Sequence, residues 1–368
     1  MTRRLLALEP YYGGSHRSVL DGLLARLDWE HDLLVMPARK WKWRMAGSAV
    51  TLADEVRRLH DAGARWDAVL ASTFVDLPAL LGLAREALAG VPAVVYFHEN
   101  QLAYPNRYER DWDFQYPLAN VRTALAADVC AFNSAYNRDS FLDEIPAFLG
   151  RFPDHRPAEV PDRIRERSIV LPPPFDPAAV DAAPLARGAV PRVVWPHRWD
   201  HDKDPDAFFD AVEALAAEGL AFEVAVAGQA HDDVRDAFES RARRLGERLV
   251  TLGGLETREE YAALLRTCDV AVSTANHEFF GLAMAEASYA GCFPLVPDRL
   301  AYPEVYPGPF RYRSSEDLVA RLRALVSEPP PPNAAREVGE RYSFDALMPR
   351  YSELLDSLAE RRAPSGLG

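Results

Sequence analysis

Short apolar runs alternate with longer stretches of helical periodicity along the first half of the chain. Compact apolar runs bounded by polar or glycine positions are typical of buried strands, and apolar residues at helical spacing fill the segments between them. The strands predicted here are 5–8, 32–36, 68–71, 93–97, 129–132 and 169–171, and the helices include 15–27, 52–60, 77–88 and 118–126. This alternation predicts βαβ units and a parallel sheet.

The same pattern restarts in the second half, after a segment rich in alanine and proline. The strands predicted there are 192–195, 222–227, 249–252, 270–273 and 293–296, again with helices between them. A second proline run at 329–332 precedes an amphipathic helix over 343–358. We therefore expect an α/β protein of two doubly wound, Rossmann-like domains that face each other across a cleft. The expected boundaries are 1–172, a linker over 173–190, a second domain over 191–342, and a terminal helix over 343–362 that packs back on the first domain.

The composition limits the class of protein but does not identify a ligand. The chain has 368 residues, of which 48% are hydrophobic and 26% charged, which is ordinary for a globular protein of two cores. Its formal net charge of −13 excludes a general polyanion binder, so any contact with nucleic acid must come from a local basic patch. Cys130, Cys268 and Cys292 lie in apolar runs without metal-binding spacing. With no signal peptide or membrane span in the pattern, we expect a cytoplasmic location.

Two glutamates flank the start of a predicted helix in the second half. Glu278 follows the apolar run 268–273, Gly281 opens the helical pattern, and Glu286 lies within the helix. A helix start presents unpaired backbone N–H groups and a positive dipole end to an anion in front of it. The two carboxylates can then reach hydroxyls on either side of that anion. A diphosphate joined to two sugars fits this arrangement, whereas the alternative is a surface loop with an ordinary helical glutamate.

Glycines and basic residues follow other predicted strands. Gly13 and Gly14 come after the first strand, and Gly228 follows 222–227, so the backbone can approach a ligand closely there. Arg198 and Lys203 follow 192–195, in a chain whose three lysines are at 40, 42 and 203. A lysine at a strand end suggests a need for a compact ammonium group that neutralises a diphosphate. A solvated charge pair beside the neighbouring aspartates is the simpler alternative, and a Gly-Gly turn alone is weak support.

Two further segments are candidates for binding the second substrate. His98, Glu99 and Asn100 end the strand 93–97, where a histidine can position hydroxyls or share a proton, or simply satisfy nearby backbone groups. The segment 39–44 interleaves two indoles with four cations. It can lie along phosphates while stacking bases, or it can begin an amphipathic helix whose tryptophan rings enter the core.

A metal is not expected. Asp111 and Asp113 form an acidic pair with no further ligand cluster in the sequence, which is weak support for a cation site. The basic side chains already supply counter-charge for a diphosphate. We therefore predict no cofactor and no obligatory metal.

These segments together resemble family 4 glycosyltransferases of the GT-B fold. The resemblance rests on the glycine pair, Arg198 with Lys203, the two glutamates and 303–305, and it spans most of the chain. More narrowly, 8–16, 36–45 and 97–105 look like the tRNA-queuosine mannosyltransferase family. The similarity implies an enzyme that transfers mannose from GDP-mannose to queuosine in the tRNA anticodon, with the α configuration retained. It also implies an acceptor-binding first domain and a donor-binding second domain.

The resemblance also implies roles for particular residues. The residues expected to take part in catalysis are His98, Glu278, Arg198 and Lys203. Those expected to bind the donor are Gly13, Gly14, Arg198, Lys203, Gly228, Glu278, Phe280, Gly281, Leu282 and Glu286. Those expected to bind the acceptor are His16, Lys40, Trp41, Lys42, Trp43, Glu99 and Asn100. Within this scheme Glu286 holds the ribose, Glu278 the donor sugar, and Arg198 and Lys203 the diphosphate.

Two other functions stay open on the residues alone. The same fold could transfer sugar to a small metabolite or a lipid, or epimerise a nucleotide sugar, and the acidic net charge mildly favours such an acceptor. A non-catalytic protein that binds a nucleotide sugar or RNA is the second alternative, although binding alone would not need both glutamates and both cations. The residues do not distinguish guanine from uracil or mannose from another hexose, and they indicate no oligomeric state.

Overall fold

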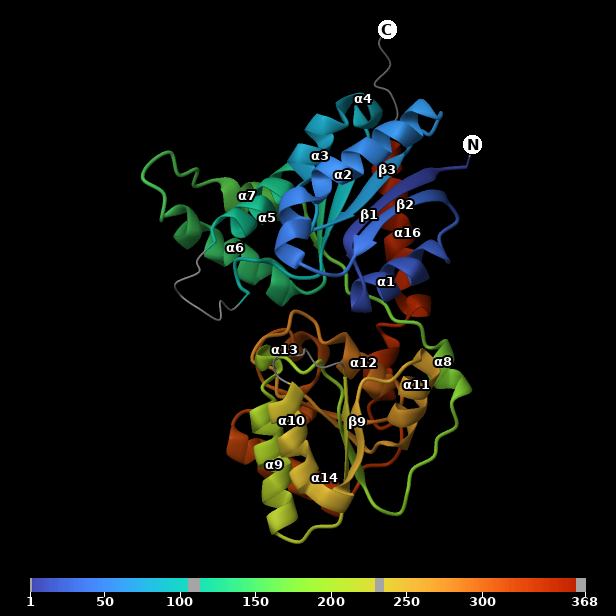
Figure 1. Cartoon of the computed structure of the whole chain (residues 1–368), viewed down its shortest axis with the longest axis vertical. Coiled ribbons are helices and arrows are strands. Elements are labelled where there is room, and N and C mark those ends of the chain that lie inside the picture. The colour runs from blue at the N-terminus through green and yellow to red at the C-terminus, as the bar shows by residue number, and fades with distance from the viewer. Residues whose placement is uncertain (1, 105–112, 229–234, 362–368) are drawn as a thin grey trace. The chain divides into compact units, whose positions relative to one another are not determined.

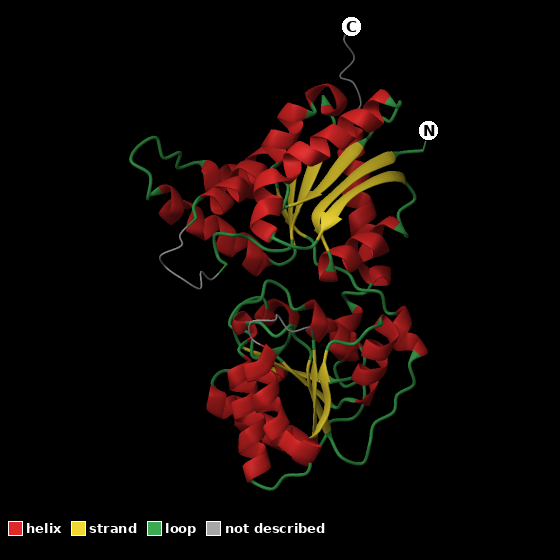
Figure 2. Cartoon of the chain, in the orientation of Figure 1, coloured by secondary structure: helices red, strands yellow, loops and turns green. Residues whose placement is uncertain are grey.

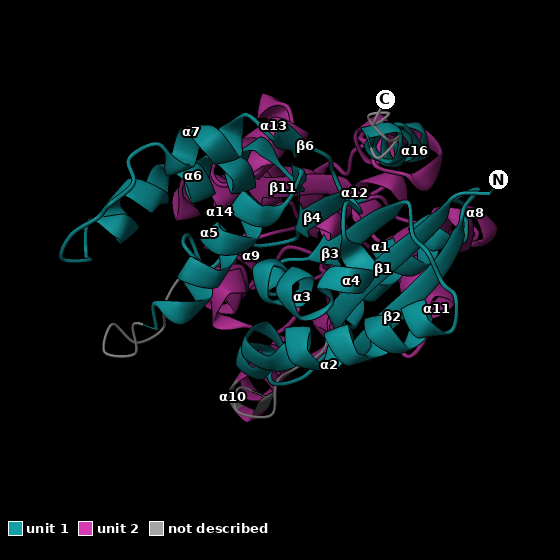
Figure 3. Ribbon diagram, turned by 90° about the horizontal axis from the view of Figure 1, so that it is seen from above, with its two compact units in different colours: residues 1–173, 347–368 teal, residues 174–346 magenta. Residues whose placement is uncertain are grey.

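The chain folds as two compact units, which Figure 3 draws in different colours. The computed structural model describes residues 2–104, 113–228 and 235–361. The first unit combines residues 1–173 with 347–368, and the second comprises 174–346. Across the described residues, no helix has both the length and the apolar character needed to cross a membrane.

A six-stranded parallel sheet forms the centre of the first unit (Figure 1, Figure 2). Its strand order is β2-β1-β3-β4-β5-β6. The strands are β1 (Arg4–Tyr12), β2 (Glu30–Pro37), β3 (Ala68–Ser72), β4 (Ala93–Phe97), β5 (Val129–Phe132) and β6 (Ser168–Val170). The helices are α1 (Gly14–Leu24), α2 (Trp41–Asp61), α3 (Leu77–Leu83), α4 (Arg85–Leu88), α5 (Gln115–Ala126), α6 (Ala135–Leu149), α7 (Val160–Arg165) and α16 (Phe344–Arg361).

Alternating side chains of these strands bury both faces of the sheet. Leu6 and Leu8 of β1 pack with Leu52 and Val56 of α2, because every second residue of a strand points to the same face. Helices α2 and α3 cover this face, while α1 and α16 lie on the opposite one (Figure 1, Figure 3). On that second face the Tyr351 hydroxyl of α16 donates to the Pro172 carbonyl at 2.9 Å. The last long helix is therefore part of the first unit.

The second unit contains another six-stranded parallel sheet, in the order β12-β11-β10-β7-β8-β9. Its strands are β7 (Arg192–Trp195), β8 (Glu223–Ala227), β9 (Leu249–Gly253), β10 (Val270–Val272), β11 (Phe293–Pro297) and β12 (Arg311–Tyr312). Its α-helices are α8 (Ala178–Ala182), α9 (Pro205–Ala217), α10 (Arg235–Ala242), α11 (Arg258–Thr267), α12 (Leu282–Tyr289), α13 (Tyr302–Val305), α14 (Ser315–Ser327) and α15 (Arg336–Glu340). Short 3-10 helices lie at His201–Lys203, Arg243–Arg248 and Gly308–Phe310.

Two hydrophobic cores form on the two faces of this sheet. Val193 and Trp195 of β7 point into the core that contains α9 and α14. The intervening Val194 points into the core that contains α11 and α12. A strand buried on both faces reads as a continuous apolar run, which is why periodicity located β7 without showing its sidedness.

The predicted α/β class and its parallel sheets are confirmed, and most strand ends lie within two residues of their predicted positions. One strand was missed, because β12 has only two residues and carries no apolar run. Helix α2 begins at Trp41, whereas the predicted helix began at residue 52. The segment expected to be a linker contains α8, and its Phe175 and Val180 are buried in a core of the second unit.

Each sheet has one point where the strand order reverses. In the first unit this point lies between β1 and β3, and in the second it lies between β7 and β10. The loops that leave neighbouring strands at such a point run to opposite faces, so a crevice opens beyond the carboxyl ends of the strands. The two clusters of polar side chains described below lie at these two points.

A glycine at the end of β8 has a packing role that can be tested. A Cβ atom on Gly228 would lie 1.9 Å from the His197 carbonyl oxygen, whereas one on Gly253, also at positive φ, would meet nothing within 4 Å. Gly228→Ala should lower the free energy of unfolding by at least about 3 kcal/mol, because backbone must move. Gly253→Ala should cost only about 1–2 kcal/mol of backbone strain. Urea unfolding of both variants checks this, and equal losses would contradict it.

Candidate active site

The loop after β7 places a lysine between two carboxylates. Lys203 ends the 3-10 helix His201–Lys203, and its Nζ lies 3.1 Å from Asp202 Oδ2 and 3.2 Å from Glu278 Oε2. Nζ also donates to the His277 carbonyl at 2.8 Å. Burial alone would lower the pKa of Lys203, but the charges of Glu278 and Asp202 outweigh it and raise that pKa. Lys203 is therefore a permanently charged group at the reversal point of the sheet.

Backbone hydrogen bonds tie this loop to the loop after β10. The Thr274 hydroxyl donates to the carbonyls of Lys203 and Asp204, both at 2.8 Å. The Asp202 carbonyl accepts from the backbone N–H groups of Asn276 and His277, at 2.8 and 3.1 Å. The two loops thus hold Lys203 and Glu278 at a fixed separation.

Glu278 is held as an anion in front of α12. Its Oε1 accepts from the backbone N–H groups of Phe279 and Phe280, at 3.1 and 3.4 Å. Burial would raise the pKa of this carboxyl, but the Lys203 charge and these hydrogen bonds lower it to about 2. Glu278 is consequently ionised at any physiological pH.

Helix α12 begins at a glycine that nothing larger could replace. Gly281 caps the helix at φ +86°, and a Cβ there would lie 2.8 Å from the Tyr302 ring. The Tyr302 hydroxyl is in turn 2.6 Å from the Ser273 hydroxyl at the end of β10. Further along α12, Glu286 is buried and accepts from Arg258 Nη2 at 2.6 Å. Arg258 was not expected in this site, because it is distant in sequence and follows no strand directly.

Two buried histidines lie beside the ion pairs. Burial and the positive charge of Lys203 lower the pKa of His197 to about 3 and that of His277 to about 4. Among the described residues, no hydrogen-bond partner reaches the buried Nε2 of His197. Both imidazoles are neutral at physiological pH. Sequence analysis gave neither of them a role.

Arg198, by contrast, lies at the exposed edge of the ion cluster around Lys203. Its side chain is 58% exposed, and its Nε lies 3.7 Å from Asp200 Oδ2. Gly228, expected to bind the donor, packs its backbone against the His197 carbonyl. Gly13 and Gly14 lie in the first unit, where Gly13 caps α1 and Gly14 is its first residue, and the other donor candidates lie in the second.

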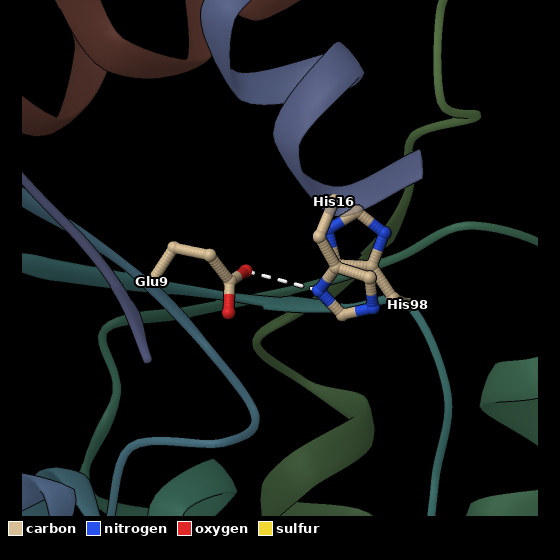
Figure 4. Close-up of side chains that lie close together, drawn as sticks. All are labelled: Glu9, His16 and His98. Carbon is tan, nitrogen blue, oxygen red and sulfur yellow. Dashed lines mark hydrogen bonds and ion pairs between the residues drawn. The ribbon is translucent and has the colours of Figure 1, made fainter. Parts of the chain in front are cut away.

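The first unit has its own polar cluster at its reversal point (Figure 4). His16 on α1 places Nδ1 at 3.0 Å from Glu9 Oε2 on β1. The ring of His16 stacks on that of His98, with centroids 3.9 Å apart and planes at 30°. Burial and the nearby His16 lower the pKa of His98 well below its ordinary value. The ligand atoms of these three side chains lie within 4.8 Å of one another, close enough to hold a metal ion.

Asn100, expected to bind the acceptor, belongs to a buried amide network. It is fully buried, donates to Asn137 Oδ1 at 2.8 Å and accepts from the backbone N–H of Ala103 at 2.7 Å. Asn137 donates in turn to Asn133 Oδ1, and Asn133 donates to the His98 carbonyl at 2.7 Å. This amide network fixes the backbone that carries His98. Glu99 is half-buried and accepts from Gln101.

The basic-aromatic segment is the first turn of α2, and its two indoles differ. Trp41 is half-buried against Tyr116, with ring centroids 5.1 Å apart, and Lys42 Nζ lies 5.8 Å from both rings. Trp43 is 64% exposed, and its ring lies over Gly47, where a Cβ would be 3.1 Å away. Lys40 is exposed at the amino end of the helix. One ring is thus packed, as the amphipathic-helix interpretation predicts, and the other is open to solvent. The acidic pair considered for a metal includes Asp111, which lies outside the described residues.

Comparison with known proteins identifies the family. The family described as tRNA-queuosine alpha-mannosyltransferase N-terminal matches residues 4–175, and glycosyl transferases group 1 matches residues 182–341. The tRNA-queuosine alpha-mannosyltransferase of Drosophila melanogaster is 35% identical over 371 residues, covering 96% of each chain. This chain belongs to the tRNA-queuosine alpha-mannosyltransferase family.

Solved structures place this family member in the GT-B fold. A UDP-forming alpha,alpha-trehalose-phosphate synthase from Burkholderia vietnamiensis superposes with a TM-score of 0.70 at 14% identity, covering 99% of both chains. Sucrose-phosphate synthase from Thermosynechococcus elongatus gives a TM-score of 0.69 at 15% identity, with 97% and 99% covered. Identities this low support the fold alone.

Buried His197, His277 and Glu278 make the stability of the second unit sensitive to acid. Below pH 6.5 an unfolded chain protonates its histidines, and below about 4.5 its glutamates. In the folded unit, His277, His197 and Glu278 take up protons only near pH 4, 3 and 2. The unfolded state therefore binds more protons, so stability should fall as pH drops from 6.5 toward 2.

Replacement of one of these buried groups should weaken the dependence of the free energy of unfolding on pH. His197→Gln should reduce the slope between pH 6.5 and 4 by up to about 1.4 kcal/mol per pH unit. His201→Asn, at an exposed position on the same loop, serves as the control and should keep the wild-type slope. Urea unfolding across this pH range measures both. An unchanged slope in His197→Gln would contradict the neutral buried state of that ring.

Proposed function

We propose that this chain transfers mannose from GDP-mannose to queuosine in tRNA and retains the α configuration. The observation that carries the proposal is the joint presence of Lys203, Glu278 and the amino end of α12 at one reversal point of a sheet. Family membership supports the choice of donor and acceptor. We further propose that the protein works in the cytoplasm, where it meets tRNA and nucleotide sugars.

The donor diphosphate binds in front of α12 in this proposal. Backbone N–H groups around Phe280–Leu282 and the Lys203 ammonium face its oxygens. Lys203 already balances Asp202 and Glu278, so it cannot neutralise the diphosphate alone. Arg198, exposed at the edge of this cluster, supplies the remaining positive charge.

The two glutamates bind the sugars on either side of the diphosphate. Glu278 accepts from hydroxyls of mannose, and Glu286 accepts from the ribose hydroxyls. Glu286 is held in place by Arg258, so its carboxylate is oriented before the nucleotide arrives. The remaining predicted donor residues, Gly13 and Gly14, lie in the first unit at the start of α1, where the backbone can approach a ligand closely.

Transfer then breaks the bond between mannose C1 and the β-phosphate oxygen, and GDP leaves. Lys203, Arg198 and the helix end stabilise the charge that develops on the phosphate. A queuosine hydroxyl attacks C1 from the same face, and its proton passes to the departing phosphate oxygen. No carboxylate nucleophile and no metal are required in this scheme. His98 holds hydroxyls of the substrate that the first unit binds.

The tRNA contacts the first unit through the start of α2. Lys40 and Lys42 face phosphates, and the open ring of Trp43 stacks on a base. Trp41 supports this surface from the interior through its contact with Tyr116.

Substitution of the donor-binding ions should abolish transfer. Lys203→Ala and Glu278→Gln should each lower kcat/KM by at least about 100-fold, because charge stabilisation and sugar binding are lost. Glu259→Gln, on the exposed side of α11, should keep the wild-type rate. Release of GDP and mass spectrometry of the modified nucleoside measure the reaction with queuosine-containing tRNA. Near-wild-type rates in both active-site variants would contradict the proposal.

The exposed indole should matter for tRNA and not for folding. Trp43→Ala should weaken tRNA binding by about 1–3 kcal/mol and leave the melting temperature unchanged, since the ring is 64% exposed and lies over Gly47 of its own helix. Val50→Ala, at a 58% exposed position of α2, should alter neither quantity. Filter binding across a salt series measures the affinity. Wild-type affinity in Trp43→Ala would remove this surface from the proposal.

A further inference from the structure

A buried carboxylate in the first unit has no role in the scheme above. Glu9 lies at the carboxyl end of β1 and is 2% exposed. Its Oε1 accepts from the Tyr11 backbone N–H at 2.8 Å and from the Ser72 hydroxyl at 3.0 Å. Its Oε2 faces Nδ1 of His16 at 3.0 Å (Figure 4). Two neighbouring strands therefore fix this carboxylate, and its second oxygen is directed at one imidazole.

The Glu9 contact determines how the protons of the histidine pair are arranged. A carboxylate oxygen only accepts, so the proton must be on Nδ1 of His16, which leaves Nε2 on the far side of the ring. His16 and His98 are stacked with centroids 3.9 Å apart, so two positive charges on them would repel strongly. Because Glu9 touches only His16 of the two, it places any shared positive charge there and leaves His98 neutral.

The surroundings of His98 are consistent with a neutral His98 ring beside a His16 ring that carries any positive charge. Its ring packs edge-on against Tyr96 at 4.6 Å, and its carbonyl is bound by Asn133. It lines a small cavity together with Glu9, Tyr96 and Tyr351. A neutral imidazole at this place offers one donor and one acceptor to a hydroxyl.

We propose that Glu9 is a positioning residue for mannosyl transfer: through Nδ1 of His16 it fixes the orientation and protonation of the stacked His16–His98 pair. The inference rests on the proposed function and adds a residue that this scheme does not use. Glu9 acts through His16, and His98 is the member that meets substrate hydroxyls.

The same three side chains could instead hold a divalent metal, but their geometry favours positioning. Oε1 of Glu9 already accepts two hydrogen bonds, and Oε2 lies at hydrogen-bond distance from His16. Nearly parallel, stacked rings direct their in-plane nitrogen lone pairs alongside each other, whereas ligands of one ion must converge on a point.

The test compares two substitutions that remove different contacts of the same carboxylate. In Glu9→Gln the amide keeps an oxygen for Tyr11 and Ser72 but presents an N–H donor to His16. Ser72→Ala removes one hydrogen bond to Glu9 and leaves the contact with His16 intact. We expect Glu9→Gln to lower kcat at least about tenfold with KM for GDP-mannose within about twofold, and Ser72→Ala to stay within about threefold in both.

A spectroscopic measurement separates positioning from a loss of fold. In histidine labelled with ¹⁵N, His16 should carry its proton on Nδ1 in the wild type and in Ser72→Ala, and on Nε2 in Glu9→Gln. Wild-type kcat in Glu9→Gln would overturn the inference, and so would equal losses of kcat and melting temperature in both variants. Stoichiometric zinc binding that restores activity after chelation would also overturn it, in favour of a metal site. Failure of the wild-type chain to modify tRNA would instead remove the proposed function.

Discussion

The buried ion cluster around Lys203 is the interaction on which the second unit depends. One ammonium group binds two carboxylates and a backbone carbonyl, and it joins the loops that leave β7 and β10. Removal of one member of such a buried cluster leaves an uncompensated charge, at a cost of about 3–5 kcal/mol. The same contacts keep Glu278 ionised and hold it before the amino end of α12. In the proposed scheme, the stability of the second unit and the binding of an anionic donor therefore come from one set of contacts.

The first unit also holds a buried charged group at the reversal point of its sheet, but with different contacts. At its reversal point it has no lysine, and a buried glutamate is satisfied by a hydroxyl, a backbone N–H and an imidazole. An amide network of Asn100, Asn133 and Asn137 fixes the strand end that carries His98. A charged cluster suits the binding of a diphosphate, whereas neutral and hydrogen-bonding groups suit the recognition of hydroxyls. The two units thus differ in the chemistry that each presents at its reversal point.

Much of the fold could be predicted, because strands buried on both faces appear as short apolar runs. Elements that depend on distant contacts could not be predicted in this way. Strand β12 exists because Arg311 and Tyr312 pair with β11, and α2 begins at Trp41, whose ring packs against Tyr116. The expected linker packs into a core through Phe175 and Val180. In each case the deciding contact lies far away along the chain, where local propensity carries no information.

The residues of the candidate site also fall into two classes, those that the sequence predicted and those that only the fold revealed. Lys203, Glu278, Gly281 and Glu286 could be recognised in the sequence, because strand ends and helix starts have local patterns and chemically distinctive residue types. Only tertiary structure decided that Asn100 is a buried backbone support, that Gly228 accommodates the His197 carbonyl, and that Arg258 holds Glu286. It also brought Glu9, His16 and His98 together from β1, α1 and the end of β4. A sequence determines which groups are available and roughly where their strands end. The neighbours that set a group's charge, tautomer and orientation are chosen by packing between segments remote in sequence, so only the folded chain reveals them.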